Sequence, residues 1–208
     1  MEDNSMDGVV TDPPFGIGFQ YNEYVDAKEG YGAWIWECVS EAERIAKPGA
    51  PIFVWQAMPN ITHFSEWFPR RWRIFAACKN FTQVRRNAVM QYSFDPVVVW
   101  WKEGGEPWSA KTANRDFYVA NTRPSTRKVI GDYVEGHPCP RPLSQVRLII
   151  EQWVPPGGVV LDPFMGSGTT GVACRSIGRK FVGCEIDKGY FEIAKARIES
   201  AQARERLL

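Results

Sequence analysis

Short apolar strands alternate with amphipathic helices along most of this sequence, and the alternation limits the possible folds more than any other feature. The strands are expected at residues 8–11, 51–55, 73–77, 97–101, 159–161 and 180–184. The helices are expected at residues 31–46, 143–153, 167–177 and 188–204. Strands that alternate with helices form a mostly parallel sheet whose two faces are both covered by helices. The sequence therefore predicts an α/β fold built on an open, doubly wound sheet.

Composition adds limits on size, partners and location. The 208 residues fit one domain, and 25 Lys and Arg almost balance 24 Asp and Glu. A site for a polyanion must therefore be a local patch. No run of about 18 apolar residues occurs, and the five cysteines include no C-x-x-C pair. We expect a soluble, cytoplasmic protein with a single domain over residues 1–208, no membrane association and no metal site.

A glycine-rich turn follows the strand at 159–161 and opens the next helix, with the sequence Asp-Pro-Phe-Met-Gly-Ser-Gly-Thr at 162–169. The missing side chains of Gly166 and Gly168 allow a ligand to approach the backbone, although glycines in such a turn can also serve packing alone. Glu185 closes the next strand, about 20 residues further on, where a carboxylate can accept hydrogen bonds from both ribose hydroxyls. The pattern indicates a nucleoside cofactor, and on this pattern NAD fits as well as S-adenosylmethionine.

The turn Asp12-Pro13-Pro14-Phe15 stands at the carboxyl end of the first strand, which stops there because proline cannot donate to a ladder. An exocyclic base amine is a poor nucleophile because its lone pair is delocalised into the ring. Asp12 and the carbonyl of Pro13 could accept hydrogen bonds from this amine as the nitrogen pyramidalises. Phe15 could stack on a base that has been taken out of its duplex. Asp-Pro-Pro is also a common loop sequence, so the turn alone leaves a purely structural role open.

The two turns together resemble those of the amino methyltransferases of restriction–modification systems and phages. Asp-Pro-Pro-Phe at 12–15 matches their catalytic D/N/S-P-P-Y/F/W motif, and the turn at 162–170 matches their cofactor loop. The order of catalytic motif, recognition region and cofactor loop is that of the permuted beta class. The similarity covers residues 3–15, the helix and strand up to Trp55, and residues 137–198. It implies a Rossmann-like methyltransferase fold, S-adenosyl-L-methionine as the cofactor, and the cytoplasm of a bacterial or phage-infected cell.

The resemblance also implies individual contacts with S-adenosylmethionine. It assigns Phe164 to the cofactor's adenine, Glu185 to its ribose, and the turn around Gly166 and Gly168 to its methionine portion. The segment His-Pro-Cys-Pro-Arg-Pro at 137–142 is similar to the family's H-P-x-x-K-P segment at the methionine end, with arginine in place of the usual lysine. The cofactor-binding residues expected on these grounds are His137, Arg141, Asp162, Phe164, Gly166, Ser167, Gly168, Thr169 and Glu185.

Related chains usually contain a further strand and an acidic turn, which contacts the cofactor's adenine, just before a segment like residues 1–5. This sequence starts after that point. We therefore expect either a sheet that lacks one edge strand or a true start that lies upstream.

Basic residues gather in the middle of the chain, at about 70–136, where related enzymes carry their DNA-recognition region. The DNA-binding residues expected there are Arg70, Arg71, Arg85, Arg86, Arg123 and Arg127. Their spacing suits contacts with phosphates and an occasional base edge, although a run of charge is often only a solvated surface. The irregular stretch 104–136 is expected to be a long loop, which either carries binding work or is a surface excursion.

These expectations combine into one function. We expect the chain to transfer a methyl group from S-adenosylmethionine to adenine N6 of a flipped base in double-stranded DNA, with Asp12, Pro13, Pro14 and Phe15 as catalytic residues. The amine nitrogen would attack the sulfonium methyl directly, with no covalent enzyme intermediate and no metal. The alternatives are methylation of cytosine N4, where serine more often replaces Asp12, methylation of RNA or of a protein amide, and a non-catalytic DNA-binding protein that keeps the fold. A homodimer is compatible with these expectations.

Overall fold

One sheet of seven strands forms the centre of the molecule in a computed structural model of the chain. The structure describes residues 1–18, 26, 29–67, 72–83, 92–110, 114–121, 134–135 and 140–205. The strands are β1 (Gly8–Thr11), β2 (Pro51–Trp55), β3 (Arg73–Gln83), β4 (Tyr92–Trp101), β5 (Phe117–Ala120), β6 (Val159–Asp162) and β7 (Lys180–Gly183). Their order across the sheet is β5-β3-β4-β2-β1-β6-β7. β4 runs antiparallel to β2 and β3, while the other strand pairs are parallel. The predicted mostly parallel sheet is confirmed.

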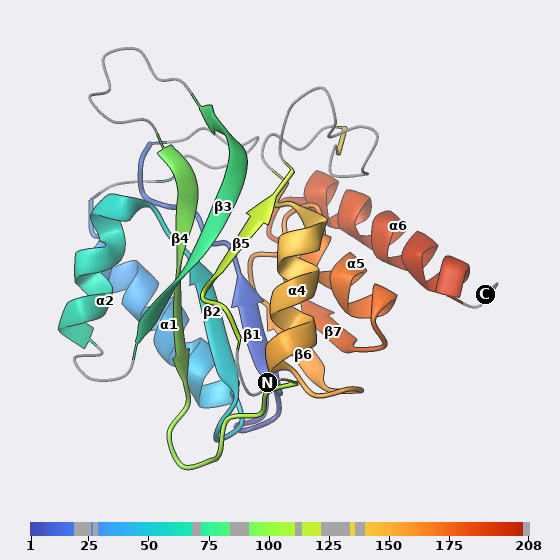
Figure 1. Cartoon of the computed structure of the whole chain (residues 1–208), viewed down its shortest axis with the longest axis horizontal. Coiled ribbons are helices and arrows are strands. Elements are labelled where there is room, and N and C mark those ends of the chain that lie inside the picture. Colours follow the sequence, from blue (N-terminus) through green and yellow to red (C-terminus); the bar gives the residue numbers. More distant parts are fainter. Residues whose placement is uncertain are drawn as a thin grey trace.

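Helices cover both faces of this sheet. They are α1 (Tyr31–Ile45), the short turn η1 (Met58–Asn60), α2 (Ile61–Trp67), α4 (Leu143–Trp153), α5 (Thr169–Ser176) and α6 (Lys188–Glu205). Figure 1 shows α1 and α2 on one side of the sheet and α4, α5 and α6 on the other. Each side has its own buried core, one containing Val9 and Ile35 and the other Val10 and Ile149. Among the described helices, none is long and apolar enough to cross a membrane.

β1 and β6 are neighbours in the sheet although they belong to opposite ends of the sequence. Gly8 pairs with Val160 in parallel register. From β1 the chain continues to β2 on one side, and from β6 it continues to β7 on the other side. The two strands therefore flank the topological switch point, where open α/β sheets bind their ligands at the carboxyl ends of the strands. Both turns that the sequence predicts to be functional begin there, after Thr11 and at Asp162.

The antiparallel part of the sheet extends further than the sequence predicts. β3 continues to Gln83, and β4 already begins at Tyr92. A proline hides the start of β4, because proline is rare inside central strands. In the structure Pro96 lies opposite Ala76 of β3, and its carbonyl accepts a hydrogen bond from the amide of Gln56 at 3.0 Å. The carbonyl of Pro96 thus takes part in a backbone hydrogen bond, although proline has no N–H group to donate.

The stretch 104–136, predicted to be a loop, contains the edge strand β5, so the prediction is wrong for residues 117–120. β5 pairs only with β3 within the described part of the chain. Its residues Phe117 and Val119 are 43% and 51% exposed although both are apolar. The segment therefore lacks the alternation of polar and apolar residues that marks a half-buried strand in a sequence. At the other edge, no described strand pairs with the outer side of β7. Within the described residues, the sheet ends at β7 on this side.

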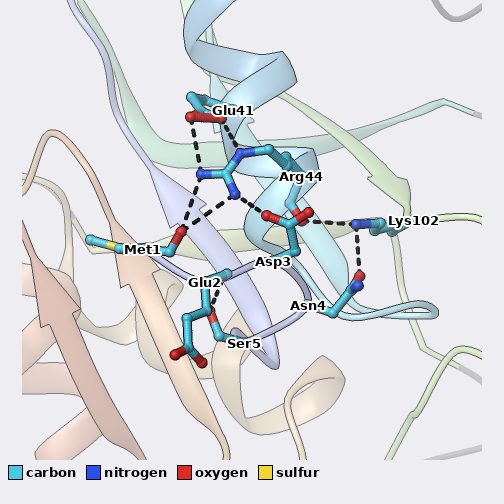
Figure 2. Close-up of polar contacts among 8 residues, drawn as sticks. All are labelled: Met1, Glu2, Asp3, Asn4, Ser5, Glu41, Arg44 and Lys102. Atoms are coloured by element: carbon cyan, nitrogen blue, oxygen red, sulfur yellow. Dashed lines mark hydrogen bonds and ion pairs between the residues drawn. The ribbon is translucent and has the colours of Figure 1, made fainter.

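The first residues of the chain are held against the carboxyl end of α1 by a cluster of charged side chains (Figure 2). The guanidinium of Arg44 donates to the carboxylate of Glu41 at 2.5 Å and also to the carboxylate of Asp3. Lys102 donates to the side-chain oxygen of Asn4 at 2.9 Å and to the carbonyl of Arg44 at 3.0 Å. The cluster lies at the end of the sheet where β1 begins, so it anchors the chain away from the two turns.

Candidate active site

The turn after β6 is held in shape by a carboxylate that follows β7. Glu185 accepts hydrogen bonds from the amide of Gly166 at 2.8 Å and from the amide of Asp187 at 2.9 Å. Gly168 has a φ of 80° at the start of α5, a conformation that favours glycine, and helix α5 therefore begins later than predicted. A Cβ on Gly168 would lie 2.9 Å from the Cβ of Ala194 on α6. The glycines of this turn serve both its backbone conformation and the packing of α6.

Asp162 links this turn to the end of β1. Its buried carboxylate accepts hydrogen bonds at Oδ1 from the Thr11 hydroxyl at 2.7 Å and from the Phe164 amide at 3.1 Å. Oδ2 accepts a hydrogen bond from the Thr170 hydroxyl at 2.6 Å. Burial raises the pKa of Asp162 to about 6, although the hydrogen bonds lower it by favouring the charged form. One carboxylate thus holds together the ends of two strands and the start of α5.

Asp12, the first residue after β1, is held by Arg141, which lies just before α4. Arg141 Nε donates to Oδ2 of Asp12 at 2.6 Å and Nη2 donates to Oδ1 at 2.7 Å, so the pair is bidentate. The guanidinium carbon lies 5.5 Å from the centroid of the Phe15 ring and 6.0 Å from that of Trp55. The Asp12 side chain remains 28% exposed. The predicted catalytic turn therefore presents an oriented, accessible carboxylate beside an aromatic ring.

A polar network supports the backbone of the same turn from the side of α1. The Asn60 side-chain amide donates to the carbonyl of Phe15 at 2.7 Å and to the side-chain oxygen of Gln56 at 3.2 Å. The Tyr31 hydroxyl donates to the same Gln56 oxygen at 3.0 Å, and burial raises the pKa of this phenol. The Tyr31 ring also packs on Gly16, where a Cβ would lie 2.5 Å from Cδ2 of the ring. Residues of α1 and η1, together with Gln56 just after β2, therefore fix the path of the turn.

Apolar side chains border the cofactor turn. Phe164 is partly exposed, and its ring meets Trp34 of α1 edge to face with the centroids 5.6 Å apart. Ile186, next to Glu185, is 91% exposed. Apolar surface beside a carboxylate that can accept ribose hydroxyls, with a glycine backbone on the other side, fits the adenosine part of a nucleoside cofactor.

The structure brings most of the predicted site residues together at the carboxyl ends of β1 and β6. Those that lie there are Asp12, Pro13, Pro14, Phe15, Arg141, Asp162, Phe164, Gly166, Ser167, Gly168, Thr169 and Glu185. Ser167 and Thr169 are buried, so their side chains support the turn from within. His137 and the predicted DNA-binding residues lie outside the described residues, the latter being Arg70, Arg71, Arg85, Arg86, Arg123 and Arg127. In the part of the chain that the structure describes, no group of three His, Cys, Asp or Glu could hold a metal ion.

Several residues that shape the site belong to no motif in the sequence. They are Thr11, Tyr31, Gln56, Asn60, Lys79 and Asp95. Most of them reach the site from another helix or strand, so spacing along the chain gives no sign of them. The available signal is a polar residue in an apolar setting, such as Asp95 shortly before the run of valines in β4.

The fold and the site together define the class of protein. A doubly wound sheet with a glycine turn and an acidic residue at its switch point, beside an Asp-Pro-Pro-Phe turn, is that of an S-adenosylmethionine-dependent methyltransferase. Within this class, the model of the DNA methylase family of N6 and N4 methyltransferases matches residues 6–196. The chain belongs to this DNA methylase family. The family and the cofactor predicted from the sequence are thereby confirmed.

Relatives agree with this assignment, and solved structures share the fold. Type II methyltransferase M.HpaI of Haemophilus parainfluenzae is 24% identical, with 96% of this chain and 70% of the relative aligned. DNA adenine methyltransferase YhdJ of Escherichia coli K12 is 22% identical over 95% of this chain and 77% of its own length. The M1.HpyAVI–SAM complex has a TM-score of 0.70 at 22% identity, covering 93% of this chain and 89% of the other. PvuII DNA methyltransferase, named as cytosine-N4-specific, has a TM-score of 0.73 at 16% identity, covering 98% and 86%. The two structures share the fold of this chain.

Proposed function

We propose that this chain methylates the N6 amine of adenine in double-stranded DNA, acting on a base flipped out of the duplex. The observation that carries the proposal is the position of the Asp12 turn directly beside the cofactor turn, where the Thr11 hydroxyl donates to Asp162 at 2.7 Å. Aspartate at the first position of the turn supports adenine, because serine is more common there in cytosine N4 enzymes. The relative YhdJ is named as an adenine methyltransferase.

The residues around the cofactor turn would hold S-adenosylmethionine. Phe164 and Ile186 would contact its adenine, Glu185 its ribose hydroxyls, and the backbone at 166–168 its methionine portion. When bound, the cofactor supplies a methyl group made electrophilic by the sulfonium. The predicted contact of Arg141 with the methionine carboxylate stays a prediction. The guanidinium already donates to the carboxylates of Asp12 and Asp95, so a third carboxylate would have to compete with them for its N–H groups.

The residues of the catalytic turn would activate and orient the base amine. The Asp12 carboxylate and the Pro13 carbonyl would accept hydrogen bonds from the amine, so that electron density returns to the nitrogen as it attacks. Phe15 would stack on the flipped base. Alignment of the two reactants and acceptors that are already in place supply the acceleration. The six arginines of the middle region would hold the phosphates of the duplex.

Cytosine N4 is the second candidate acceptor, because PvuII methyltransferase, whose fold this chain shares, is named as cytosine-N4-specific. The test is to incubate the protein with mixed-sequence duplex DNA and methyl-labelled S-adenosylmethionine, digest the DNA and separate the nucleosides. N6-methyladenine is the expected product. N4-methylcytosine would replace the base assignment, and cofactor and DNA binding without any methylated nucleoside would identify a non-catalytic DNA-binding protein.

The Asp12→Ala variant tests the site in the same assay. Activity should fall by about 100- to 1,000-fold, because an acceptor needed in the transition state is lost. The affinity for S-adenosylmethionine, measured by calorimetry, should stay close to that of the wild type, since the cofactor turn keeps its own hydrogen bonds. Full turnover by Asp12→Ala would exclude Asp12 as the catalytic carboxylate.

A further inference from the structure

We propose that Asp95 is a positioning residue for methyl transfer, acting through Arg141 on Asp12. The inference rests on the proposed role of Asp12 as the catalytic carboxylate. Asp95 lies on β4 beyond the carboxyl end of β2, whose last residue Trp55 pairs with Val97. It therefore stands at the same end of the sheet as the catalytic turn.

Arg141 is held on two sides. While Nε and Nη2 donate to Asp12, Nη1 donates to Oδ2 of Asp95 at 2.7 Å. Lys79 of β3 donates to the other oxygen of Asp95, Oδ1, at 2.9 Å. Positive and negative side chains thus alternate from β3 to the catalytic turn. Because the guanidinium is planar and rigid, carboxylates along two of its edges fix the orientation of its plane.

The position of Asp95 in β4 is unusual for a structural residue. It lies two positions before Val97 and four before Val99, and alternate residues of a strand share a face. Both valines belong to the buried core that includes Ile149 of α4. A carboxylate in this row costs free energy unless it is paired. An apolar residue would continue the core at no such cost, so the charge at Asp95 calls for a reason other than packing.

Stability alone does not account for this charge. The side chains of Lys79, Asp95, Arg141 and Asp12 are between 19% and 28% exposed, so solvent screens their attraction in part, and an apolar residue at position 95 could also stabilise the core. Geometry does account for it. When a catalytic carboxylate is displaced by about 1 Å from its working position, the rate of reaction can fall by about 100-fold. By fixing the plane of Arg141, Asp95 fixes the direction of the Asp12 oxygens.

The first test compares Asp95→Asn with a matched loss of an ion pair elsewhere. Asp7 pairs with Lys47 at 2.6 Å at the beginning of β1, away from the site, so Asp7→Asn is the control. For Asp95→Asn we expect kcat to fall by about 10- to 100-fold, with little change in the KM for DNA or in the affinity for S-adenosylmethionine. Asp7→Asn should keep the wild-type kcat. Wild-type kcat in Asp95→Asn, or an equal loss in both variants, would overturn the proposal.

The second test places Asp95→Asn in an Asp12→Asn background, where asparagine keeps one acceptor and therefore some activity. If Asp95 acts through Asp12, the second substitution should change kcat much less than it does in the wild type. The same fold-loss in both backgrounds would overturn the proposal. Full turnover by Asp12→Ala, which keeps no side-chain acceptor, would instead refute the proposed catalytic turn, so the two failures are distinct.

A further variant keeps the proposal testable if Asp95→Asn does not fold. Lys79→Met leaves the contact between Asp95 and Arg141 in place and removes only the other partner of Asp95. We expect a smaller fall in kcat, again with unchanged KM for DNA and cofactor affinity. An unchanged kcat in Lys79→Met, when Asp95→Asn cannot be measured, would overturn the proposal.

Discussion

The two turns of the active site are held by different kinds of partners. In the turn after β6, the amide of Gly166 bonds to Glu185, which is 19 residues away along the chain. In the turn after β1, the carboxylate of Asp12 bonds to Arg141, which is 129 residues away. A turn closed by near neighbours keeps its shape within its own segment. A turn closed by a distant partner depends on the packing of the whole domain. A substitution in the turn after β6 should therefore have local effects, while one in the turn after β1 should also be sensitive to changes elsewhere in the domain.

Asp162 does not fit this division into near and distant partners. Its carboxylate accepts hydrogen bonds from Phe164 and Thr170 nearby and from Thr11 at the end of β1. Its pKa is about 6 in the folded protein, against an ordinary value near 4. The folded state therefore keeps a proton that the unfolded chain releases between about pH 4 and pH 6. The stability contributed by Asp162 is complete below about pH 4 and is lost as the pH rises through 6, by up to about 3 kcal/mol.

The variant Asp162→Asn should remove this pH dependence. Urea unfolding between pH 4 and pH 8 measures it, because the other titrating groups cancel when the variant is compared with the wild type. The free energy of unfolding of Asp162→Asn minus that of the wild type should rise with pH. Parallel curves for the two proteins would mean that the hydrogen bonds from Thr11 and Thr170 offset the cost of burial completely.

Glu185→Ala should sharpen the comparison, since its effect should stay within the cofactor turn. The variant loses two hydrogen bonds to backbone amides and the proposed contact with ribose. We expect the affinity for S-adenosylmethionine to fall by about 10- to 100-fold, while DNA binding is retained. Calorimetry with the exposed Glu199→Ala on α6 as control measures this. Unchanged cofactor affinity in Glu185→Ala would refute the assignment.

The smallest effect is expected in the basic middle region, outside both turns. Neutralising Arg85 and Arg86 together should weaken binding to unrelated duplexes alike and reduce the salt dependence by up to roughly one unit for each lost phosphate contact. Cofactor affinity should not change. Titrations at several salt concentrations on cognate and scrambled DNA measure this. Loss of discrimination at one base would indicate a base-edge contact of about 1 to 3 kcal/mol instead, and unchanged affinity throughout would mean that both arginines only solvate a surface.

The same difference explains what could be predicted from the sequence. The cofactor turn with Glu185 and the strands β1, β2, β6 and β7 follow from contiguous patterns, and the structure has them at or near the predicted residues. Arg141 was placed at the site by its motif, but its bond to Asp12 joins residues that no spacing connects. Asp95 was missed for a second reason, because the adjacent Pro96 obscures the start of β4. Contacts across the sheet are set by strand register, which a local pattern does not encode.

The bond between Thr11 and Asp162 also bears on how the chain folds during synthesis, since it spans 151 residues. When β1 and the Asp12 turn leave the ribosome, the strand that will pair with one edge of β1 does not yet exist. That edge stays open until β6 has been made, and an unpaired edge is where wrong strand pairing and chaperone contact begin. Closing so long a loop is slow. The Asp12 turn is therefore synthesised early, but its connection to the cofactor turn forms only after β6 has been made, so we expect no methyl transfer by the unfinished chain.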